Sequence, residues 1–407
     1  MLKVGIIGAG AAGYFAAIHA SSQHNQVTIL EKTSKSLAKV KISGGGRCNV
    51  THAALEVNHL VKNYPRGEKF LKKSFHQFAV KDTIDWFESR GVKLKVEADG
   101  RMFPISDDAE SIIQALKNEA LKKQVTIKYQ FGVSEIRFSG QKFELSNGKE
   151  TLVFDRLIIC TGGSPKLEGF DFIKALGHEI QAPVPSLFTF NTPSEPIKSL
   201  MGIAMPEAHV KLEGTKLSYK GPLLITHWGI SGPAVLKLSA FGAKWLAEQT
   251  YKAKAHIRWN ASWTEDGLMQ DVNQFKTAHP KKKVSTNPLF GIPARLWEHL
   301  VLRADIREAD LWHEISKKQL NRLIQNLFCY IVAIEGKTTF KEEYVTAGGV
   351  SLNEVNPETM ESKITPGLFF AGEVLDIDGI TGGFNFQAAW TTGYIAGKHA
   401  DQPKNNE

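Results

Sequence analysis

The chain opens with a short apolar run that is typical of a buried strand. Residues 2–7 (LKVGII) lead into a glycine-rich turn, and the small apolar residues from Ala11 onward favour a helix. A second apolar run, residues 27–30, ends in Glu31. This order predicts a strand, a helix and a second strand within the first 31 residues, the usual start of a parallel α/β sheet.

Up to about residue 190 the pattern continues as a long excursion of helices and strands. Helical spacing predicts helices over 67–90 and 107–123, and short apolar runs predict strands at 126–129 and 133–136. Asn147–Gly148 lies between alternating apolar residues and predicts the tight turn of a β-hairpin.

The middle of the chain changes character twice. Between about 191 and 262 apolar and polar residues alternate in short runs, which predicts a small β-barrel. Residues 263–320 instead have helical periodicity, as in 289–302 and 309–323. From about residue 335 the chain returns to apolar runs like those of its first region, so the middle is predicted to be an insertion.

The glycine-rich turn after the first strand matches a known phosphate-binding pattern. Gly8, Gly10 and Gly13 form G-x-G-x-x-G: the first permits a tight turn, the second lets a pyrophosphate approach the backbone, and the third lets the helix pack closely. The free N–H groups at the helix start, at Ala11 and Ala12, favour phosphate binding. The pattern predicts an adenine dinucleotide.

The end of the second strand supplies the residues expected around the adenosine. Glu31 is placed to accept hydrogen bonds from ribose hydroxyls, and an acid there favours an unphosphorylated ribose. Lys32, which follows it, and Val133, at the start of a later strand, are also assigned to cofactor binding.

The last part of the chain identifies the dinucleotide as FAD. An apolar strand over 365–371 ends in Gly372–Glu373, and a glycine-rich turn leads through Gly383, Phe384 and Asn385 into an apolar helix. This resembles flavoproteins of the glutathione-reductase structural group, in which the acid binds a ribityl hydroxyl and the helix points its N-terminus at flavin N1 and O2. An ordinary βα unit with a glycine-rich loop is the alternative.

A third marker of the same group lies at the end of a central strand. Residues 157–163 (LIICTGG) are similar to its Ala-Thr-Gly segment, and Cys160 replaces the usual alanine. Thr161, Gly162 and Gly163 are therefore assigned to cofactor binding.

A glycine-rich loop follows the adenosine segment and is expected to reach the flavin. Three successive glycines, Gly44–Gly46, let backbone N–H groups converge on an anion, and Arg47 is placed to neutralise a phosphate or an anionic flavin. Cys48 has no partner cysteine nearby, which excludes a dithiol mechanism. It is either a packing residue or a lone acid or nucleophile near the flavin. The cofactor contacts expected from this loop are Gly45, Gly46, Arg47, Cys48 and Asn49.

Composition places the chain among ordinary globular proteins of the cytoplasm. It has 407 residues, of which 42% are hydrophobic and 23% charged, enough for two or three domains. Three cysteines indicate a reducing compartment, and no apolar run approaches the roughly 20 residues of a membrane helix. We therefore expect no membrane partner. The N-terminal strand is expected to be part of the core, which excludes a signal peptide.

The net charge of +8 is unevenly distributed. Residues 31–100 contain fourteen Lys or Arg and eight acidic residues. Such a segment attracts nucleic acid or an anionic nicotinamide cofactor, or is a set of solvated surface lysines. Lys281–Lys283 is expected to be a solubilising loop tip.

Nearly the whole chain resembles the BaiN-like, or HI0933-like, flavoproteins. The resemblance is found in residues 41–51 (KISGGGRCNVT), 226–234 (THWGISGPA), 345–350 (VTAGGV) and 367–393, although the loop after Gly163 is shorter than usual. It implies an NAD(P)/FAD-dependent oxidoreductase or aminoacetone oxidase. It also implies a Rossmann-type FAD-binding domain with an inserted substrate-capping domain.

The α/β architecture can now be stated in full. We predict a Rossmann-type FAD-binding domain of the glutathione-reductase structural group over 1–190 and 335–407. The insertion is predicted to have a β-barrel-like part, 191–262 and about 321–334, and a helical part, 263–320.

The substrate side of the site has fewer markers. His227 is a candidate acid/base, although a histidine that fixes a loop is the alternative, and no His/Cys cluster has metal-ligand spacing. No second G-x-G-x-x-G is present, so NAD(P)H is expected as a transient electron donor at the open flavin face.

Three functions remain open. The first is a tight, non-covalent FAD reductase that passes hydride from NADH or NADPH to an activated double bond, with a uracil in ribosomal RNA as the leading substrate. Family members linked to dihydrouridine formation imply this substrate. The second is a flavin oxidase of a small amine or ketone such as aminoacetone, and the third is a non-enzymatic binding protein. The partner is thus a small molecule or structured RNA, and the oligomeric state is open.

Overall fold

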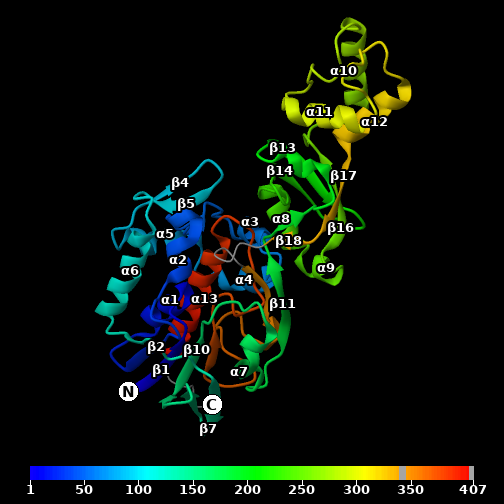
Figure 1. Ribbon diagram of the computed structural model, residues 1–407. Helices are drawn as coiled ribbons and strands as arrows, with labels where there is room; N and C mark the ends of the chain where they lie inside the picture. Colours follow the sequence, from blue (N-terminus) through cyan, green and yellow to red (C-terminus); the bar gives the residue numbers. More distant parts are fainter. Residues whose placement is uncertain (339–344, 403–407) are drawn as a thin grey trace. The chain divides into compact units, whose positions relative to one another are not determined.

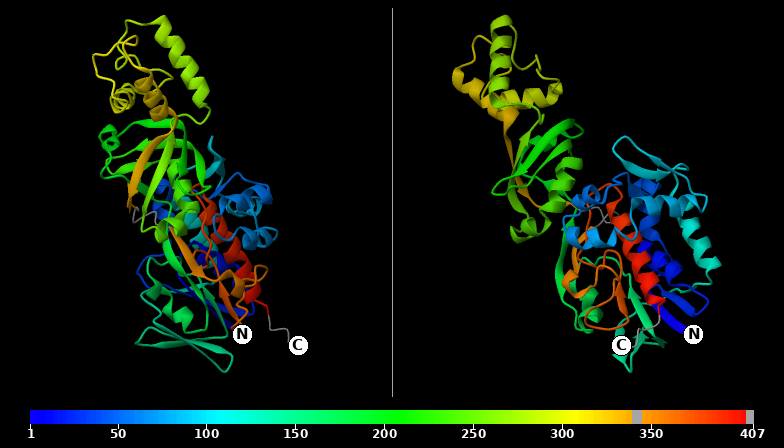
Figure 2. Two further views of the ribbon diagram at one scale, coloured as in Figure 1. Left: turned by 90° about the vertical axis from the view of Figure 1, so that its right-hand side faces the viewer. Right: turned by 180° about the vertical axis from the view of Figure 1, so that it is seen from behind.

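The computed structural model describes residues 1–338 and 345–402 and divides the chain into two units (Figures 1 and 2). The first unit comprises Met1–Ser186 and Phe340–Glu407, and the second comprises Leu187–Thr339. The middle of the chain is therefore an insertion, and each unit is described by itself.

A five-stranded parallel sheet forms the centre of the first unit, in the order β20-β10-β1-β2-β6. Its strands are β1 (Leu2–Ile7), β2 (Asn25–Leu30), β6 (Thr126–Lys128), β10 (Arg156–Ile159) and β20 (Leu368–Phe370). The order reverses between β1 and β10, the topological switch point at which such sheets bind ligands. The expected Rossmann-type fold is confirmed.

Two helices from opposite ends of the chain pack side by side on this sheet (Figure 1). They are α1 (Ala11–Ala20) and α13 (Phe384–Ala400). Glycines on α13 permit the close approach, since a Cβ on Gly397 would lie 2.3 Å from the carbonyl oxygen of Ala16 and one on Gly393 would lie 2.8 Å from that of Ala12. The two termini are thus joined in one core.

Smaller elements complete the first unit. The helices are α2 (Ala38–Ile42), α3 (Val57–Leu60), α4 (Glu68–Ser74), α5 (Val80–Glu88), α6 (Ala109–Lys122) and α7 (Asp171–Lys174). The strands are β3 (Thr51–His52), β4 (Leu94–Val96), β5 (Arg101–Pro104), β7 (Glu135–Ser139), β8 (Lys142–Ser146), β9 (Thr151–Phe154), β11 (Ile180–Ser186) and β19 (Val345–Val350).

The second unit contains a seven-stranded antiparallel sheet in the order β17-β16-β13-β14-β15-β12-β18. Its strands are β12 (Thr189–Asn191), β13 (Ala204–Leu212), β14 (Ser218–Ile225), β15 (Gly229–Ser231), β16 (Lys252–Arg258), β17 (Tyr330–Glu335) and β18 (Lys337–Thr338). One edge strand, β17, runs through Gly336 into the opposite edge strand, β18. The sheet therefore curls on itself.

Helices cover this sheet and extend beyond it. They are α8 (Pro233–Phe241), α9 (Ala243–Glu248), α10 (Glu265–Ala278), α11 (Ala294–Arg303) and α12 (Lys317–Phe328). The indoles of Trp259, Trp297 and Trp312 are fully buried in one apolar cluster that continues from the sheet into the last three helices.

Several helix boundaries differ from those predicted. The single helix expected over 67–90 is two helices, α4 and α5, interrupted at 75–79. The helix expected from 289 begins only at Ala294, because Phe290 and Gly291 have left-handed backbones and Pro293 follows. The helical periodicity expected over 309–323 corresponds to α12, which begins only after the N-cap Ser316 and runs to Phe328. The helical part therefore does not end at residue 320.

Candidate cofactor site

The carboxyl ends of β1, β10 and β20 bring together three glycine-containing loops that are far apart in the sequence. A Cβ on Gly8 would lie 2.5 Å from the carbonyl oxygen of Cys160, and one on Gly372 would lie 2.8 Å from the Cβ of Ala12. One on Gly163 would lie 2.9 Å from Oε1 of Glu373. The first and last segments of the predicted site therefore meet at one edge of the sheet.

The glycines of the first turn have two different roles. A Cβ on Gly13 would lie 1.9 Å from the carbonyl oxygen of Gly8, so this position is required for packing. A Cβ on Gly10, the N-cap of α1, would meet nothing within 4 Å, and no side chain caps this helix end. Open space therefore lies beside free N–H groups at Ala11 and Ala12, which is the environment that a pyrophosphate needs.

Glu31 is buried at the end of β2 and organises the neighbouring backbone. Its Oε2 accepts from the Ala9 N–H at 3.0 Å, and its Oε1 accepts from the N–H and hydroxyl of Thr33, both at 2.8 Å. A carboxylate has about four acceptor positions, so one remains for a ribose hydroxyl. The contact with Ala9 ties the adenosine segment to the glycine turn.

The two other residues assigned to the adenosine lie near Glu31. Lys32 is exposed, and a Cβ on Gly132 would lie 3.5 Å from the Cβ of Lys32. Val133 is half-buried in the segment that follows. The Phe131 N–H donates to the carbonyl oxygen of Glu31 at 2.9 Å, which holds the two segments together.

The glycine-rich loop before Arg47 has a backbone that favours glycine at three positions in succession. Gly44, Gly45 and Gly46 have φ of 57°, 69° and 86°, and a Cβ on Gly45 or Gly46 would meet nothing within 4 Å. Successive left-handed residues leave N–H groups free to converge on an anion. The loop therefore offers an open cradle.

Asn49 connects this loop to the start of α13. With its amide oriented to satisfy both groups, its oxygen accepts from the Gly383 N–H at 3.0 Å and its nitrogen donates to the Thr51 carbonyl at 2.9 Å. Asn385 pins the turn before α13 by accepting from the N–H of Gly379 at 2.8 Å and donating to its carbonyl at 3.0 Å. Phe384, the first residue of α13, is buried. The N-terminus of α13 is thus held by Asn49, from a distant part of the chain, and by Asn385 of the helix itself.

Cys48 is fully buried, and its backbone is left-handed with φ of 61°. Burial raises the pKa of its thiol to about 12, so the thiol stays protonated at neutral pH. Such a group is a poor nucleophile, and its surroundings favour the packing interpretation.

Glu373 connects two segments that the sequence analysis did not assign to the cofactor. Its Oε1 accepts from the Thr346 N–H at 2.8 Å, and its Oε2 pairs with Nζ of Lys39 at 2.8 Å. The hydroxyl of Thr346 is buried beside Gly163 and has no hydrogen-bond partner within the described residues. Thr346 belongs to the VTAGGV segment, whereas no signal in the sequence points to Lys39.

Thr161 and Gly162 lie in the same loop as Gly163. Thr161 is exposed, and Gly162 has a left-handed backbone with φ of 74°. A Cβ on Gly162 would lie 4.0 Å from Oε2 of Glu373. The loop after β10 therefore borders the Glu373 carboxylate with an unobstructed backbone.

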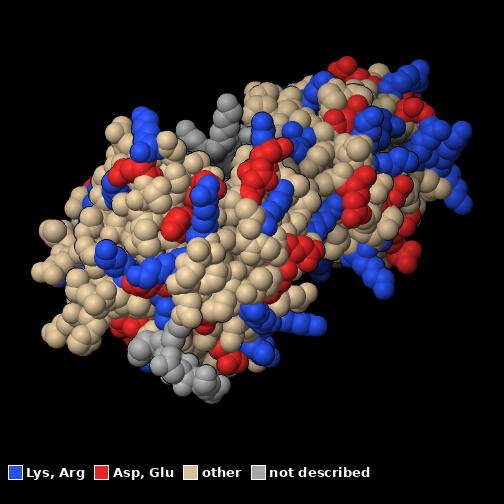
Figure 3. Space-filling view, turned by 90° about the horizontal axis from the view of Figure 1, so that it is seen from below, with Lys and Arg blue, Asp and Glu red and all other residues tan. Residues whose placement is uncertain are grey.

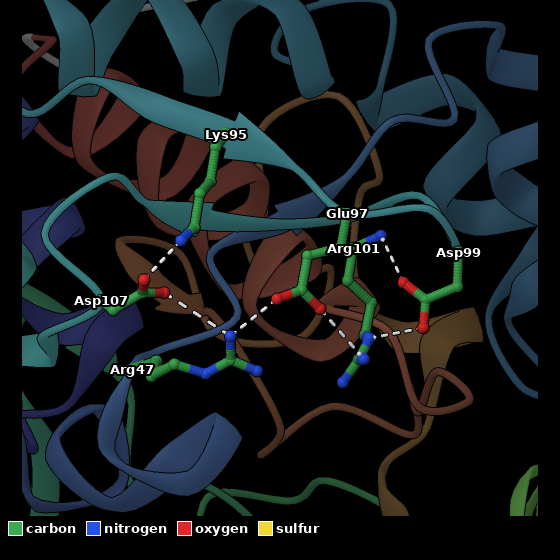
Figure 4. Close-up of polar contacts among 6 residues, drawn as sticks. All are labelled: Arg47, Lys95, Glu97, Asp99, Arg101 and Asp107. Atoms are coloured by element: carbon green, nitrogen blue, oxygen red, sulfur yellow. Dashed lines mark hydrogen bonds and ion pairs between the residues drawn. The ribbon is translucent and has the colours of Figure 1, made fainter.

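Arg47 belongs to a network of surface charges (Figure 4). Its guanidinium donates to Oε1 of Glu97 at 2.6 Å, lies 3.5 Å from Oδ1 of Asp107 and stacks 4.0 Å from the centroid of the Phe103 ring. Lys95 also pairs with Asp107, and Arg101 pairs with Glu97 at 3.1 Å. Several charges of the basic segment are therefore neutralised within the unit, which weakens the electrostatic argument for a nucleic-acid surface there.

His227 belongs to the second unit, in the turn between β14 and β15. Its side chain is exposed, and its ring centroid lies 3.7 Å from that of Trp228. An exposed imidazole is accessible for acid/base chemistry, and its catalytic role stays a prediction.

These residues fit FAD. The open space at Gly10 and the free end of α1 suit the pyrophosphate, and Glu31 suits the ribose. The unpartnered Thr346 hydroxyl next to Glu373 requires a polar group, which the ribityl chain or flavin would supply. The described residues contain no group of three His, Cys, Asp or Glu side chains that could hold a metal ion.

Comparison with known proteins identifies the family. The model of the HI0933-like protein Rossmann domain matches residues 2–399. The chain belongs to this family. It is therefore an enzyme, an FAD-dependent oxidoreductase. Among the described residues, no helix is long and apolar enough to cross a membrane.

Two relatives span nearly the whole chain. The 3-dehydro-bile acid delta(4,6)-reductase of Clostridium scindens is 31% identical and covers 98% of this chain and 99% of its own. The ribosomal RNA dihydrouridine synthase of Escherichia coli is 30% identical and covers 96% of this chain and 95% of its own.

A solved structure shares the fold. The 3-ketosteroid-delta4-(5alpha)-dehydrogenase of Rhodococcus jostii aligns with a TM-score of 0.52 at 13% identity, over 99% of this chain and 97% of its own. At this level of identity the likeness concerns the fold alone.

Proposed function

We propose that this enzyme is a reductase that adds two hydrogens across an activated carbon–carbon double bond, using NAD(P)H as electron donor. The names of the two full-length relatives carry the proposal. A delta(4,6)-reductase and a dihydrouridine synthase act on chemically unrelated molecules, yet both names describe saturation of a conjugated C=C bond. The shared bond change is the part most readily extended to this chain.

When bound, FAD supplies a carrier that accepts a hydride from one molecule and passes it to another. The residues of this chain bind and orient it. The N–H groups at the start of α1 would hold the pyrophosphate, Glu31 would hold the ribose, and Glu373 with Thr346 would hold the ribityl region. Asn49 and Asn385 fix the N-terminus of α13, whose positive end favours negative charge.

NAD(P)H is the proposed donor, and it binds only transiently. The sequence contains one G-x-G-x-x-G, at Gly8–Gly13, and this turn serves the FAD. A nicotinamide cofactor would therefore dock transiently at the open flavin face, which requires no second dinucleotide domain.

Uracil in ribosomal RNA is the proposed substrate. The relatives named for this reaction support it. The base has to leave its stack to reach a flavin, which unpaired loop nucleotides allow at low cost. A small steroid-like enone is the second candidate, because the bile-acid reductase is equally similar.

His227 is the proposed proton donor. Hydride addition to one carbon of the double bond requires a proton at the other, and an exposed imidazole is suited to give it. Cys48 is less suited, because burial raises the pKa of its thiol to about 12.

The decisive experiment tests the electron donor and the substrate in two separate steps. The purified yellow protein is mixed anaerobically with NADH or NADPH, and bleaching of the flavin absorbance is recorded. The reduced protein then receives unmodified ribosomal RNA transcript or a steroid enone, and reoxidation of the flavin and the products are measured. Dihydrouridine in the RNA is the expected product.

The outcomes distinguish the rival functions. Bleaching by neither nucleotide, with reduction by aminoacetone and reoxidation by oxygen, would establish an oxidase. His227→Gln is expected to retain bleaching by NAD(P)H and to slow substrate reduction about 100-fold, the usual contribution of general acid catalysis. Unchanged substrate reduction in this variant would exclude His227 as the donor.

A further inference from the structure

A hollow of about 400 Å³ lies in the helical part of the second unit, outside the cofactor site. Its walls come from the second half of α10 and from the segment before α11. Phe275 and Phe290 supply aromatic rings, and Asp271, Gln274 and His279 supply polar groups. The hollow therefore combines aromatic walls with a few polar groups, which are the two kinds of group that ligand sites use.

Three consecutive lysines adjoin this hollow. Lys281–Lys283, called here the lysine turn, lies just after α10, past His279 and Pro280, and all three side chains are exposed. Nζ of Lys282 lies 5.7 Å from the centroid of the Phe275 ring. None of the three forms an ion pair with a carboxylate in residues 1–338 or 345–402, so their charges are available to a ligand.

The lysine turn is anchored to a buried segment. The Trp312 N–H donates to the carbonyl oxygen of Lys282 at 3.0 Å, the His313 N–H donates to that of Pro280 at 3.0 Å, and Lys283 pairs with Leu311 in a β-bridge. The Trp312 indole is fully buried. A tip that served only solubility would not need this support, whereas a binding site gains from fixed geometry.

An aromatic residue is held in an unfavourable backbone conformation at the opposite wall. Phe290 has φ of 59°, in the left-handed region that glycine adopts more easily. Its ring lies 5.3 Å from that of Trp263, measured between centroids. The Phe290 ring is half-buried and packs against the apolar cluster of this unit, and this packing accounts for an aromatic residue at a position that glycine would adopt more easily.

The geometry points to a binding site for unpaired RNA nucleotides at this hollow and lysine turn. A base stacks on Phe275 or Phe290, and its polar edge donates to Asp271 and exchanges hydrogen bonds with Gln274. The adjoining phosphates contact Lys281 and Lys282. The choice of RNA rests on the proposed function, and the site would present a large substrate to the enzyme.

Direct binding tests the site without catalysis. Anisotropy of a fluorescein-labelled RNA hairpin with an unpaired loop is measured on the holoenzyme across a salt series. Lys281→Glu/Lys282→Glu is expected to weaken binding about tenfold or more and to lower the slope of log affinity against log salt by about 1.5. Phe290→Leu is expected to weaken binding about tenfold with an unchanged slope, since it removes stacking alone.

Lys72→Glu/Lys73→Glu on α4 is the matched control, because it reverses the same charge on exposed lysines of the other unit. Equal weakening by both double variants would overturn the local site in favour of diffuse electrostatics. Equal binding of a fully paired duplex or of polyglutamate would overturn the choice of unpaired RNA. FAD content and circular dichroism check that each variant folds.

The result is separable from the proposed function. Dihydrouridine formation with an unchanged KM for RNA in Lys281→Glu/Lys282→Glu would leave the reductase in place and overturn this site. Loss of hairpin binding in the variant, with no dihydrouridine made by the wild type, would establish the site and overturn the proposed substrate.

Discussion

The two units of this protein build their candidate binding surfaces from different parts of the chain. In the first unit the surface is mostly backbone: glycines at positions 8, 10, 13 and 44–46 open space for N–H groups. In the second unit the surface consists of side chains, with aromatic rings and the lysine turn around one hollow. A site built from backbone groups needs glycine at fixed spacing, so it can be recognised in the sequence. A site built from side chains needs no fixed spacing, so it cannot be recognised in this way.

Charge is also used differently in the two units. Arg47, Glu97, Arg101 and Asp107 neutralise one another at the surface of the first unit (Figure 4), and Figure 3 shows Lys and Arg scattered among Asp and Glu over the face it presents. The lysine turn has no such partners among the described residues. Local pairing, more than net charge, thus decides which basic residues remain available to an anion.

The largest effect is expected at Gly13. In Gly13→Ala the new methyl group would lie 1.9 Å from the carbonyl oxygen of Gly8, so α1 must move away from the glycine turn. We expect the free energy of unfolding to fall by about 3 kcal/mol or more, as in overpacked cores, together with loss of FAD. Urea unfolding and the FAD content of the purified protein measure both. Stoichiometric FAD in this variant would contradict the packing role.

Gly10→Val tests whether the glycine turn is a binding site made of backbone groups. The valine would occupy open space, and the backbone of Gly10, with φ of −90°, tolerates a side chain. The apoprotein is therefore expected to melt at the wild-type temperature, while FAD affinity falls about 100-fold or more through lost phosphate contacts. Titration of the apoprotein with FAD measures this. Wild-type affinity would place the pyrophosphate elsewhere.

A pH dependence is expected from His19 in the first unit. Burial lowers its pKa from 6.5 to about 4, so the folded state binds its proton less readily than the unfolded state. Its stability contribution is complete above pH 6.5 and is lost as the pH falls toward 4. We expect a loss of about 2 kcal/mol in urea unfolding that His19→Gln removes. The same pH profile in the wild type and in His19→Gln would contradict this assignment.

The smallest effect is expected at Arg47. Its partners Glu97 and Asp107 are partly exposed, so Arg47→Gln is expected to change the free energy of unfolding by less than about 1 kcal/mol. FAD affinity should stay within about threefold if the network of Figure 4 persists in the holoenzyme. A much larger loss of FAD affinity would restore the role predicted for Arg47 at a phosphate.

Features that depend on local pattern could be predicted from the sequence. The G-x-G-x-x-G turn, the strand ending in Glu31, and the late strand with Gly372–Glu373 follow from short-range spacing. Backbone conformation there is set by residues that are near in the chain. The family resemblance and the FAD-binding fold came from the same segments, as did the existence of an insertion.

The contacts between side chains that are far apart in the sequence could be seen only in the folded structure. Lys39 forms an ion pair with Glu373, and Asn49 accepts a hydrogen bond from the N-terminus of α13. Phe275 and Phe290 line one hollow. The local sequence around these residues does not indicate their partners. It also showed that Glu97 and Asp107 engage Arg47 and that Cys48 is fully buried. The physical reason is that these contacts depend on packing between segments that are distant in the sequence. The local periodicity of each segment does not specify its partner.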